Sequence, residues 1–240
     1  MTKFQATLKS VKKHKVPDWF HDAKFGIFIH WGLYSIPAFA PSNKGENLKI
    51  LAKEGWTAYY AHNPYAEWYL NSMKITDSPT QKYHFKSYGK DFSYEDFAPI
   101  FNEAIQDWDP EEWADLFKQM GAKYVVLVTK HLDGFLMWPS KYSNPKKKTY
   151  CANRDIVGEL TKAVRERGMK MGLYYSSGLD STFVNLEIKD VVDEFGKAPN
   201  SPEYIEMIDS HWKELIDVYK PSILWNDIGY PKDANLYELF

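Results

Sequence analysis

The sequence predicts an α/β fold in which short parallel strands alternate with helices that cover them. Four short runs of mostly apolar residues stand between charged or turn-forming segments, as is typical of strands that are buried on both faces. Segments with helix-start signals and an apolar stripe precede the second, third and fourth runs, and this alternation favours a parallel sheet covered by helices. The four runs cover residues 25–31, 124–129, 171–175 and 223–225.

The helix expected before the second run has clear start and stop signals. Asp109 stands at the N-cap position, Pro110 at the first helical position, and a glutamate follows where it can complete a capping box. Gly121 is expected to end the helix, because glycine readily adopts the left-handed conformation that follows a last turn. One face of the helix is expected to be apolar and is formed by Trp113, Leu116, Phe117 and Met120.

Two further helices are expected before the third and fourth runs. Asn153 precedes the first of them, which ends at Gly168 and carries an apolar stripe formed by Ile156, Val157, Leu160 and Val164. Ser201 and Pro202 open the second, and Pro221 ends it ahead of the last run. Its inward-facing residues are expected to be Ile205, Ile208, Trp212, Leu215, Ile216 and Tyr219.

A long excursion, residues 35–108, follows the first run and is rich in aromatic residues, proline and glycine. A connection of this length is usually functional or folded separately. Since it leaves the carboxyl end of a strand, it is expected to cover the face where β/α barrels place their active sites.

Four strands are too few to close a barrel, so the edges of the sheet would expose unpaired backbone groups. We therefore expect a complementary chain or a second copy of this chain to complete the sheet, or non-specific association of a truncated chain.

Composition narrows the class of partner. The 30 basic and 32 acidic side chains leave a formal net charge of -2, so no overall field attracts nucleic acid or an anionic membrane. Aromatic residues make up 17% of the chain, which suits sugar binding but also a bulky core. No stretch approaches the roughly 18 apolar residues of a membrane span, and the lysine-rich start lacks a secretory apolar run, so we expect a cytoplasmic protein. Cys151 is the only cysteine, which excludes an internal disulfide and a cysteine-based zinc cage.

Polar residues at the carboxyl ends of all four runs are the strongest functional signal. β/α barrels present their catalytic groups at this edge of the sheet. Each segment alone has a structural explanation, such as a hydrogen-bonded histidine or an Asp-Gly turn. Together they predict an active site, to which the strands contribute His30-Trp31-Gly32, Lys130-His131-Leu132-Asp133-Gly134-Phe135, Tyr174-Tyr175-Ser176 and Trp225-Asn226-Asp227.

Longer motifs extend this signal over most of the chain. They are, in order, Trp19-Phe20, Lys24-Phe25-Gly26-Ile27-Phe28-Ile29-His30-Trp31-Gly32, Asn63-Pro64-Tyr65-Ala66-Glu67-Trp68-Tyr69, Tyr88-Gly89, Trp108-Asp109-Pro110, Ala122-Lys123-Tyr124, Lys130-His131, Asp133-Gly134-Phe135 and Trp225-Asn226-Asp227. In this order they resemble the α-L-fucosidases of glycoside hydrolase family 29, from about Val16 to Pro231. The resemblance implies a fold of the (β/α)8-barrel type, with residues 1–240 forming one partial catalytic domain. About four parallel strands and their helices are expected in this half barrel, without the carboxyl-terminal half of the barrel or a β-sandwich.

The resemblance implies a retaining hydrolase that removes terminal α-L-fucose from small-molecule or oligosaccharide substrates through a covalent fucosyl-enzyme. Asp227 matches the family nucleophile. Glu67 is considered as a substitute acid/base, because a carboxyl group with a raised pKa can donate a proton. No cofactor and no metal ion are implied. The positions that resemble fucose-binding residues are His30, Glu67, Trp68, His131, Tyr174 and Trp225.

Two departures from the family pattern keep other functions open. Leu132 follows His131 where many members have a second histidine, so one polar contact with the sugar is lost or made otherwise. The family's usual acid/base glutamate and a substrate-binding arginine lie beyond its nucleophile, and nothing in this chain occupies their places. One alternative is a non-catalytic fucose-binding or assembly subunit that needs another chain to supply the acid/base. Another alternative, which rests on the strand-end residues themselves because histidine and carboxylate also suit zinc, is a metal-dependent hydrolase that uses His30, His131 and Asp133.

Overall fold

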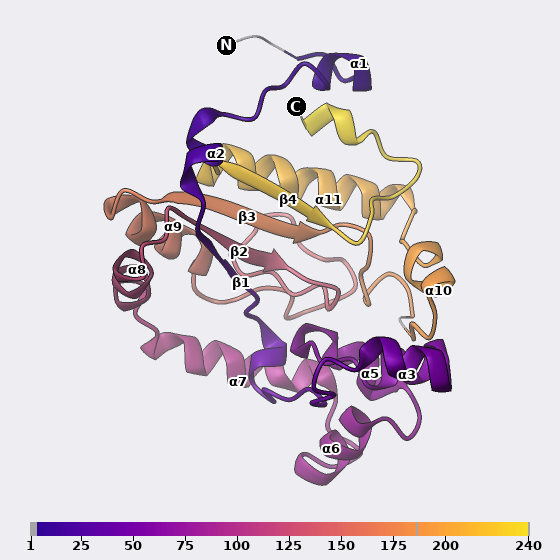
Figure 1. Ribbon diagram of the computed structural model, residues 1–240. Coiled ribbons are helices and arrows are strands. Elements are labelled where there is room, and N and C mark those ends of the chain that lie inside the picture. Colours follow the sequence, from indigo (N-terminus) through magenta and orange to yellow (C-terminus); the bar gives the residue numbers. More distant parts are fainter. Residues whose placement is uncertain (1–3, 186, 240) are drawn as a thin grey trace.

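A four-stranded parallel sheet forms the centre of the computed structural model, which describes residues 4–185 and 187–239 (Figure 1). The strand order follows the sequence, so each strand lies beside the next along the chain. This arrangement confirms the predicted parallel sheet, and each predicted run overlaps its strand. The strands are β1 (Gly26–Ile29), β2 (Tyr124–Lys130), β3 (Lys170–Ser176) and β4 (Ile223–Asp227).

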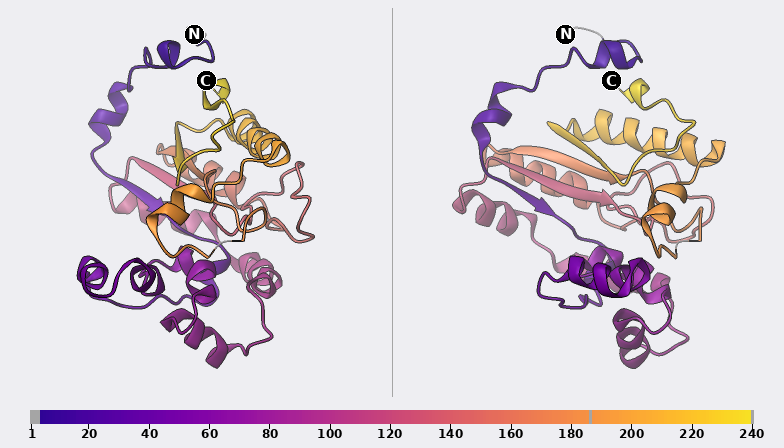
Figure 2. Two further views of the ribbon diagram at one scale, coloured as in Figure 1. Left: turned by 90° about the vertical axis from the view of Figure 1, so that its right-hand side faces the viewer. Right: turned by 45° about the vertical axis from the view of Figure 1, so that its right-hand side comes forward.

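The three predicted helices precede β2, β3 and β4 and lie together against one face of the sheet (Figures 1 and 2). They are α8 (Pro110–Gln119), α9 (Ile156–Glu166) and α11 (Pro202–Glu214), the last of which continues as the π-helical turn η5 (Leu215–Tyr219). Shorter helices and turns before and after the sheet are α1 (Leu8–Val11), α2 (Asp18–Ala23), α10 (Val191–Gly196) and η6 (Leu236–Leu239). No helix in the described part of the chain is both long and apolar enough to cross a bilayer.

Side-chain caps fix where these helices begin. The Asp109 carboxylate accepts a hydrogen bond from the Glu111 N–H at 2.8 Å, and Ser201 caps α11, so both predicted starts are confirmed. Asn153 does precede α9, but the N-cap is Asp155, whose carboxylate accepts a hydrogen bond from the Gly158 N–H at 2.8 Å.

The predicted apolar faces are buried to different extents. The stripe of α9 is fully buried, whereas Leu116 and Met120 of α8 are 52% and 56% exposed, so that part of the prediction is wrong. α8 packs against α9, and no strand of the described chain lies beyond β1. Ile205 on α11 and Ile216 on η5 are only half-buried. The remaining predicted positions of α11 and η5 are buried, namely Ile208, Trp212, Leu215 and Tyr219.

The long excursion folds into a helical insertion at the end toward which the strands point (Figure 1). Its aromatic side chains belong to the main hydrophobic core, in which Tyr69, Tyr94 and Phe97 are buried. The insertion meets the loops that leave the strands, because the ring of Phe101 contacts both Trp31 and Phe135. Its elements are η1 (Leu33–Ser35), α3 (Asn47–Glu54), α4 (Trp56–Ala61), η2 (Ala66–Trp68), α5 (Tyr69–Lys74), α6 (Pro79–Ser87), η3 (Tyr94–Asp96), α7 (Phe97–Ala104) and η4 (Ile105–Asp107).

The sheet curls like the wall of a barrel and stays open. Phe28 on the first strand and Trp225 on the last strand meet across its inner face, with ring centroids 5.4 Å apart. These two side chains are nevertheless 43% and 51% exposed. Within residues 4–185 and 187–239, neither β1 nor β4 has a strand on its outer side. The expected half barrel, with an open edge at each end, is therefore confirmed.

Candidate active site

A register shift in β2 determines which side chains reach the inner face of the sheet. Before the shift, Val128 pairs with Tyr174, and both belong to the small inner cluster. After the shift, Lys130 pairs with Tyr175, on the face that carries the helices. A bulge of this kind exchanges the faces of the residues that follow it. As a result His131 lies parallel to the ring of Tyr174, with centroids 5.7 Å apart and 1° between the planes.

Lys130 holds the bulge from the helix side. Its ammonium group donates hydrogen bonds to the carbonyls of Ser176 at 2.7 Å and Leu179 at 3.3 Å, and it lies 3.1 Å from Asp180 Oδ2. The two charged side chains are 1% and 0% exposed. Burial lowers the pKa of Lys130, and the nearby Asp180 carboxylate opposes that effect. These contacts fix Lys130 on the helix side of the sheet, and its neighbour His131 lies on the inner face.

His30 and Glu67 meet beside His131. His30 directly follows β1, and its Nδ1 lies 3.3 Å from Oε1 of Glu67, which the insertion supplies through η2. The His30 ring also contacts the rings of His131 and Tyr174, with centroids 5.5 and 5.4 Å away. The expectation that the excursion reaches the carboxyl ends of the strands is met here.

Tyr174 and Asp227 form the polar contact between the last two strands. The Tyr174 hydroxyl donates a hydrogen bond to Asp227 Oδ2 at 2.7 Å. Burial, and then the negative charge of Asp227, raises the pKa of Tyr174, so the phenol keeps its proton and remains a donor. Because the β3–β4 register pairs Ser176 with Asp227, the carboxylate is held at the end of a paired strand. This contact joins Asp227 to the group formed by Tyr174, His131, His30 and Glu67.

The two tryptophans predicted at the site lie in different surroundings. Trp225 presents an exposed indole on the inner face next to Phe28. Such a ring can stack against the C–H face of a sugar. Trp68 is buried in the hydrophobic core and packs against Tyr60, with centroids 5.7 Å apart. Trp68, which follows Glu67 in η2, is therefore part of the core.

Tyr34 is a site residue that the sequence analysis missed. Its ring meets that of His131 edge-on at 6.1 Å, and burial raises its pKa. The Tyr34 hydroxyl and His131 Nδ1 are buried without a hydrogen-bond partner among the described residues. His30 Nδ1 is close to Glu67 but also lacks hydrogen-bond geometry. Buried polar atoms are nearly always satisfied, so these orphaned atoms indicate a place for a polar ligand or water.

Asp133 lies outside this group. Its carboxylate accepts hydrogen bonds from the Tyr94 hydroxyl at 2.8 Å and the Phe135 N–H at 3.1 Å, and burial raises its pKa. The metal-hydrolase alternative combined Asp133 with His30 and His131. Among the described residues, Glu67 takes that place instead, because one of its carboxylate oxygens lies within 4.8 Å of a ring nitrogen of each histidine.

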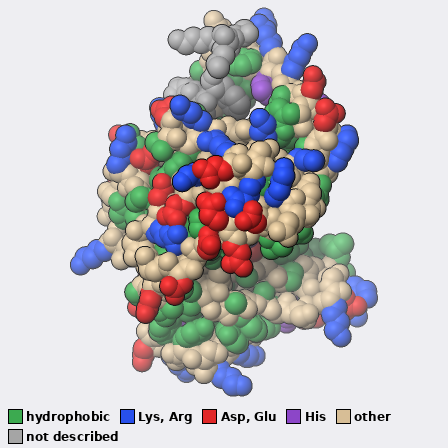
Figure 3. Space-filling view, turned by 90° about the vertical axis from the view of Figure 1, so that its left-hand side faces the viewer, with side chains coloured by type: hydrophobic (Ala, Val, Ile, Leu, Met, Phe, Trp, Pro, Cys, Tyr) green, Lys and Arg blue, Asp and Glu red, His purple; other side chains and the backbone are tan. Residues whose placement is uncertain are grey.

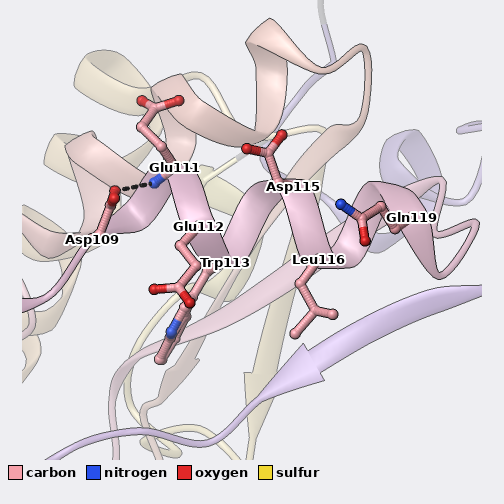
Figure 4. Close-up of a pocket in the computed structure, with 7 residues that line it drawn as sticks. All are labelled: Asp109, Glu111, Glu112, Trp113, Asp115, Leu116 and Gln119. Carbon is pink, nitrogen blue, oxygen red and sulfur yellow. Dashed lines mark hydrogen bonds between the residues drawn. The ribbon is translucent and has the colours of Figure 1, made fainter.

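A separate groove of about 580 Å³ runs along α8 (Figure 4). Its lining includes Asp109, Glu111, Asp115 and Leu116, and it shares no residue with the strand-end group. Two of its carboxylates already pair with Arg167, each at 2.6 Å. The surface on the α8 side of the molecule interleaves acidic and basic side chains (Figure 3). This groove adds nothing to the candidate site.

Comparison with known proteins matches nearly the whole chain. A family model described as Alpha-L-fucosidase matches residues 1–238. The chain is 37% identical over 237 residues to an α-L-fucosidase of Dictyostelium discoideum, a match that covers 97% of this chain and 46% of the relative. Two solved structures of Thermotoga maritima α-fucosidase, one with fucose and one with a mechanism-based inhibitor, each match with a TM-score of 0.85 at 44% and 45% identity. Each match covers 99% of this chain and 53% of the other chain, so the chain spans about half the length of these relatives.

Proposed function

The chain belongs to the α-L-fucosidase family, and from this premise we propose that it supplies the nucleophile-bearing half of a retaining α-L-fucosidase site. Asp227 is the proposed nucleophile. The observation that carries the proposal is the 2.7 Å hydrogen bond from Tyr174 to Asp227, with the rings of His30 and His131 next to Tyr174. The relatives' names indicate the substrate class, which is a small molecule or oligosaccharide that ends in α-L-fucose.

In the proposed first step, a carboxylate oxygen of Asp227 attacks the anomeric carbon of the fucoside. The bond between that carbon and the aglycone oxygen breaks, and its electron pair leaves with the oxygen, which takes a proton from an acid group. Water then displaces Asp227 from the fucosyl-enzyme and gives its proton to the conjugate base of that acid. Tyr174 holds the carboxylate in position during both steps.

The remaining groups of the pocket bind the sugar in this proposal. His30, His131 and the carboxylate of Glu67 offer hydrogen bonds to its hydroxyls, while the Trp225 indole meets an apolar face of the ring. Burial lowers the pKa of His131, which keeps the imidazole neutral and able both to donate and to accept. The contact of Glu67 with His30 favours a role in hydroxyl binding over the acid/base role that the sequence left open. Trp68, which follows Glu67 in η2, lies in the core beside this group in the chain.

The acid/base group belongs, in this proposal, to further β/α units that complete the barrel. Phe28 and Trp225 leave apolar surface exposed on the inner face, β1 and β4 have no strand on their outer sides among the described residues, and the matched relatives are about twice as long as this chain. A complementary half barrel explains these edges better than a second copy does. Two copies would bring two nucleophiles together and no group in the place of the family's acid/base.

Turnover of an aryl α-L-fucoside with an activated leaving group tests this function, because such a leaving group needs little protonation. We expect aryl alcohol release by the unmodified chain, alone or with a complementary half barrel. Asp227→Ala should abolish the release, whereas Asp217→Ala, which changes an exposed aspartate on η5, should leave it intact. Equal release by the Asp227→Ala protein would contradict the assignment. Fucose binding without any release would favour the non-catalytic binding subunit.

A further inference from the structure

The three side chains His30, Glu67 and His131 have the composition of a transition-metal site. A ring nitrogen of His30, a ring nitrogen of His131 and a carboxylate oxygen of Glu67 all lie within 4.8 Å of one another. They come from separate elements, namely the residue after β1, the turn η2 and the residue after β2. Two imidazoles and one carboxylate also form the protein ligand set of several open zinc sites, in which a fourth position takes water or another ligand.

The two histidines are available for such a bond. His131 Nδ1 and His30 Nδ1 are buried without a hydrogen bond among the described residues. Neighbouring rings restrict both imidazoles, because His131 lies parallel to Tyr174 and His30 packs against Phe28 at 5.3 Å. Fixed ligand orientation of this kind strengthens metal binding.

We propose that this pocket binds one divalent transition-metal ion, such as Zn²⁺, through His30, Glu67 and His131, and that the bound ion excludes the sugar. Zinc bonds of about 2.0–2.1 Å place neighbouring tetrahedral ligands about 3.3 Å apart. His30 Nδ1 and Glu67 Oε1 already lie at 3.3 Å, so the movement needed is the approach of His131 to that pair. The nitrogen-rich ligand set favours zinc, copper, nickel or cobalt over magnesium and calcium.

The metal site stands on this geometry alone, whereas its inhibitory effect rests on the proposed function. Isothermal titration of the full chain with ZnCl₂, after removal of metal by EDTA and desalting, tests the site directly. We expect one ion per chain and no comparable binding of Mg²⁺. His131→Ala and Glu67→Gln should each weaken Zn²⁺ binding at least about tenfold. His21→Ala removes an exposed histidine on α2 and should change nothing, which controls for surface binding.

The outcomes separate this inference from the proposed function. Thermal melts identify a variant that fails to fold, and Glu67→Gln keeps the shape of the side chain in case His131→Ala does not fold. Unchanged Zn²⁺ binding in the folded variants, or equal binding of Mg²⁺, would overturn the metal site. Fucose binding without Zn²⁺ binding would also overturn it and leave the proposed function standing. If Zn²⁺ binding depends on these residues and weakens as L-fucose is added, both the metal site and the proposed function are supported. If Zn²⁺ binding depends on these residues but L-fucose does not weaken it, the metal site is supported and the idea that the ion and the sugar share one pocket is refuted.

Discussion

Replacing Tyr174 by phenylalanine removes one oxygen atom from the site and keeps the ring that lies parallel to His131. The lost contact is the 2.7 Å hydrogen bond from the Tyr174 hydroxyl to Asp227 Oδ2. A hydrogen bond to a charged group contributes about 1.5–3 kcal/mol, and about 1.4 kcal/mol corresponds to a tenfold change in rate, so the full effect is about 10- to 100-fold. Because Asp227 is only half-buried, water can replace part of the bond, and we expect a loss nearer tenfold.

The assay is the rate of covalent labelling by 2-fluoro-fucosyl fluoride, followed as a mass increase of the intact protein. Fluoride leaves without protonation, so the rate reports on the nucleophile and not on an acid/base group. Tyr219→Phe is a matched control, because its hydroxyl also donates to an aspartate, Asp155 Oδ1 at 2.9 Å, away from the strand-end site. Labelling of the Tyr174→Phe protein at the rate of the control would refute the claim that Tyr174 positions Asp227.

Three further predictions concern the support of the site and the fold. Lys130→Met leaves Asp180 charged, buried and without its partner, so the free energy of unfolding measured in urea should fall by about 3–5 kcal/mol. A fall of less than about 1 kcal/mol would show that Lys130 does not hold the bulge. Burial lowers the pKa of His211 from 6.5 to about 4, so the unfolded chain binds a proton between these pH values that the folded chain does not. The contribution of His211 to stability should therefore be fully present above about pH 6.5. At 1.36 kcal/mol per pKa unit, the free energy of unfolding should drop by about 3 kcal/mol as the pH falls to 4. In urea titrations, His211→Gln should flatten this dependence of the free energy of unfolding on pH. Trp225→Ala should weaken L-fucose binding about fivefold, because about 1 kcal/mol of ring contact is lost. The melting temperature should change little, because the side chain is half exposed. An unchanged affinity for L-fucose in a calorimetric titration would show that Trp225 does not line the pocket.

The positions of His30, Tyr174 and Asp227 could be predicted from the sequence. Each follows or ends an apolar run, and the carboxyl ends of parallel strands necessarily share one edge of the sheet. Helix starts were equally clear where a capping side chain stands directly before proline, as at Asp109 and Ser201.

Other features depend on contacts that a linear pattern does not contain. The bulge that turns His131 to the inner face arises from pairing between β2 and β3, and alternation along β2 alone places His131 on the opposite face. Tyr34 lies in an apolar turn and reaches the site only because the insertion folds back over the strands. Leu116 and Met120 fit the apolar face of an amphipathic helix, but both side chains are more than half exposed in the described chain.

The central claim, that Asp227 attacks the sugar in the pocket formed by the four strand ends, is tested most directly by locating the label. The chain would be treated with 2-fluoro-fucosyl fluoride and digested, and the modified peptide sequenced by mass spectrometry. We expect a single fucosyl adduct on the peptide from β4, at Asp227. An adduct on Glu67 or any other carboxylate, with Asp227 unmodified, would contradict it.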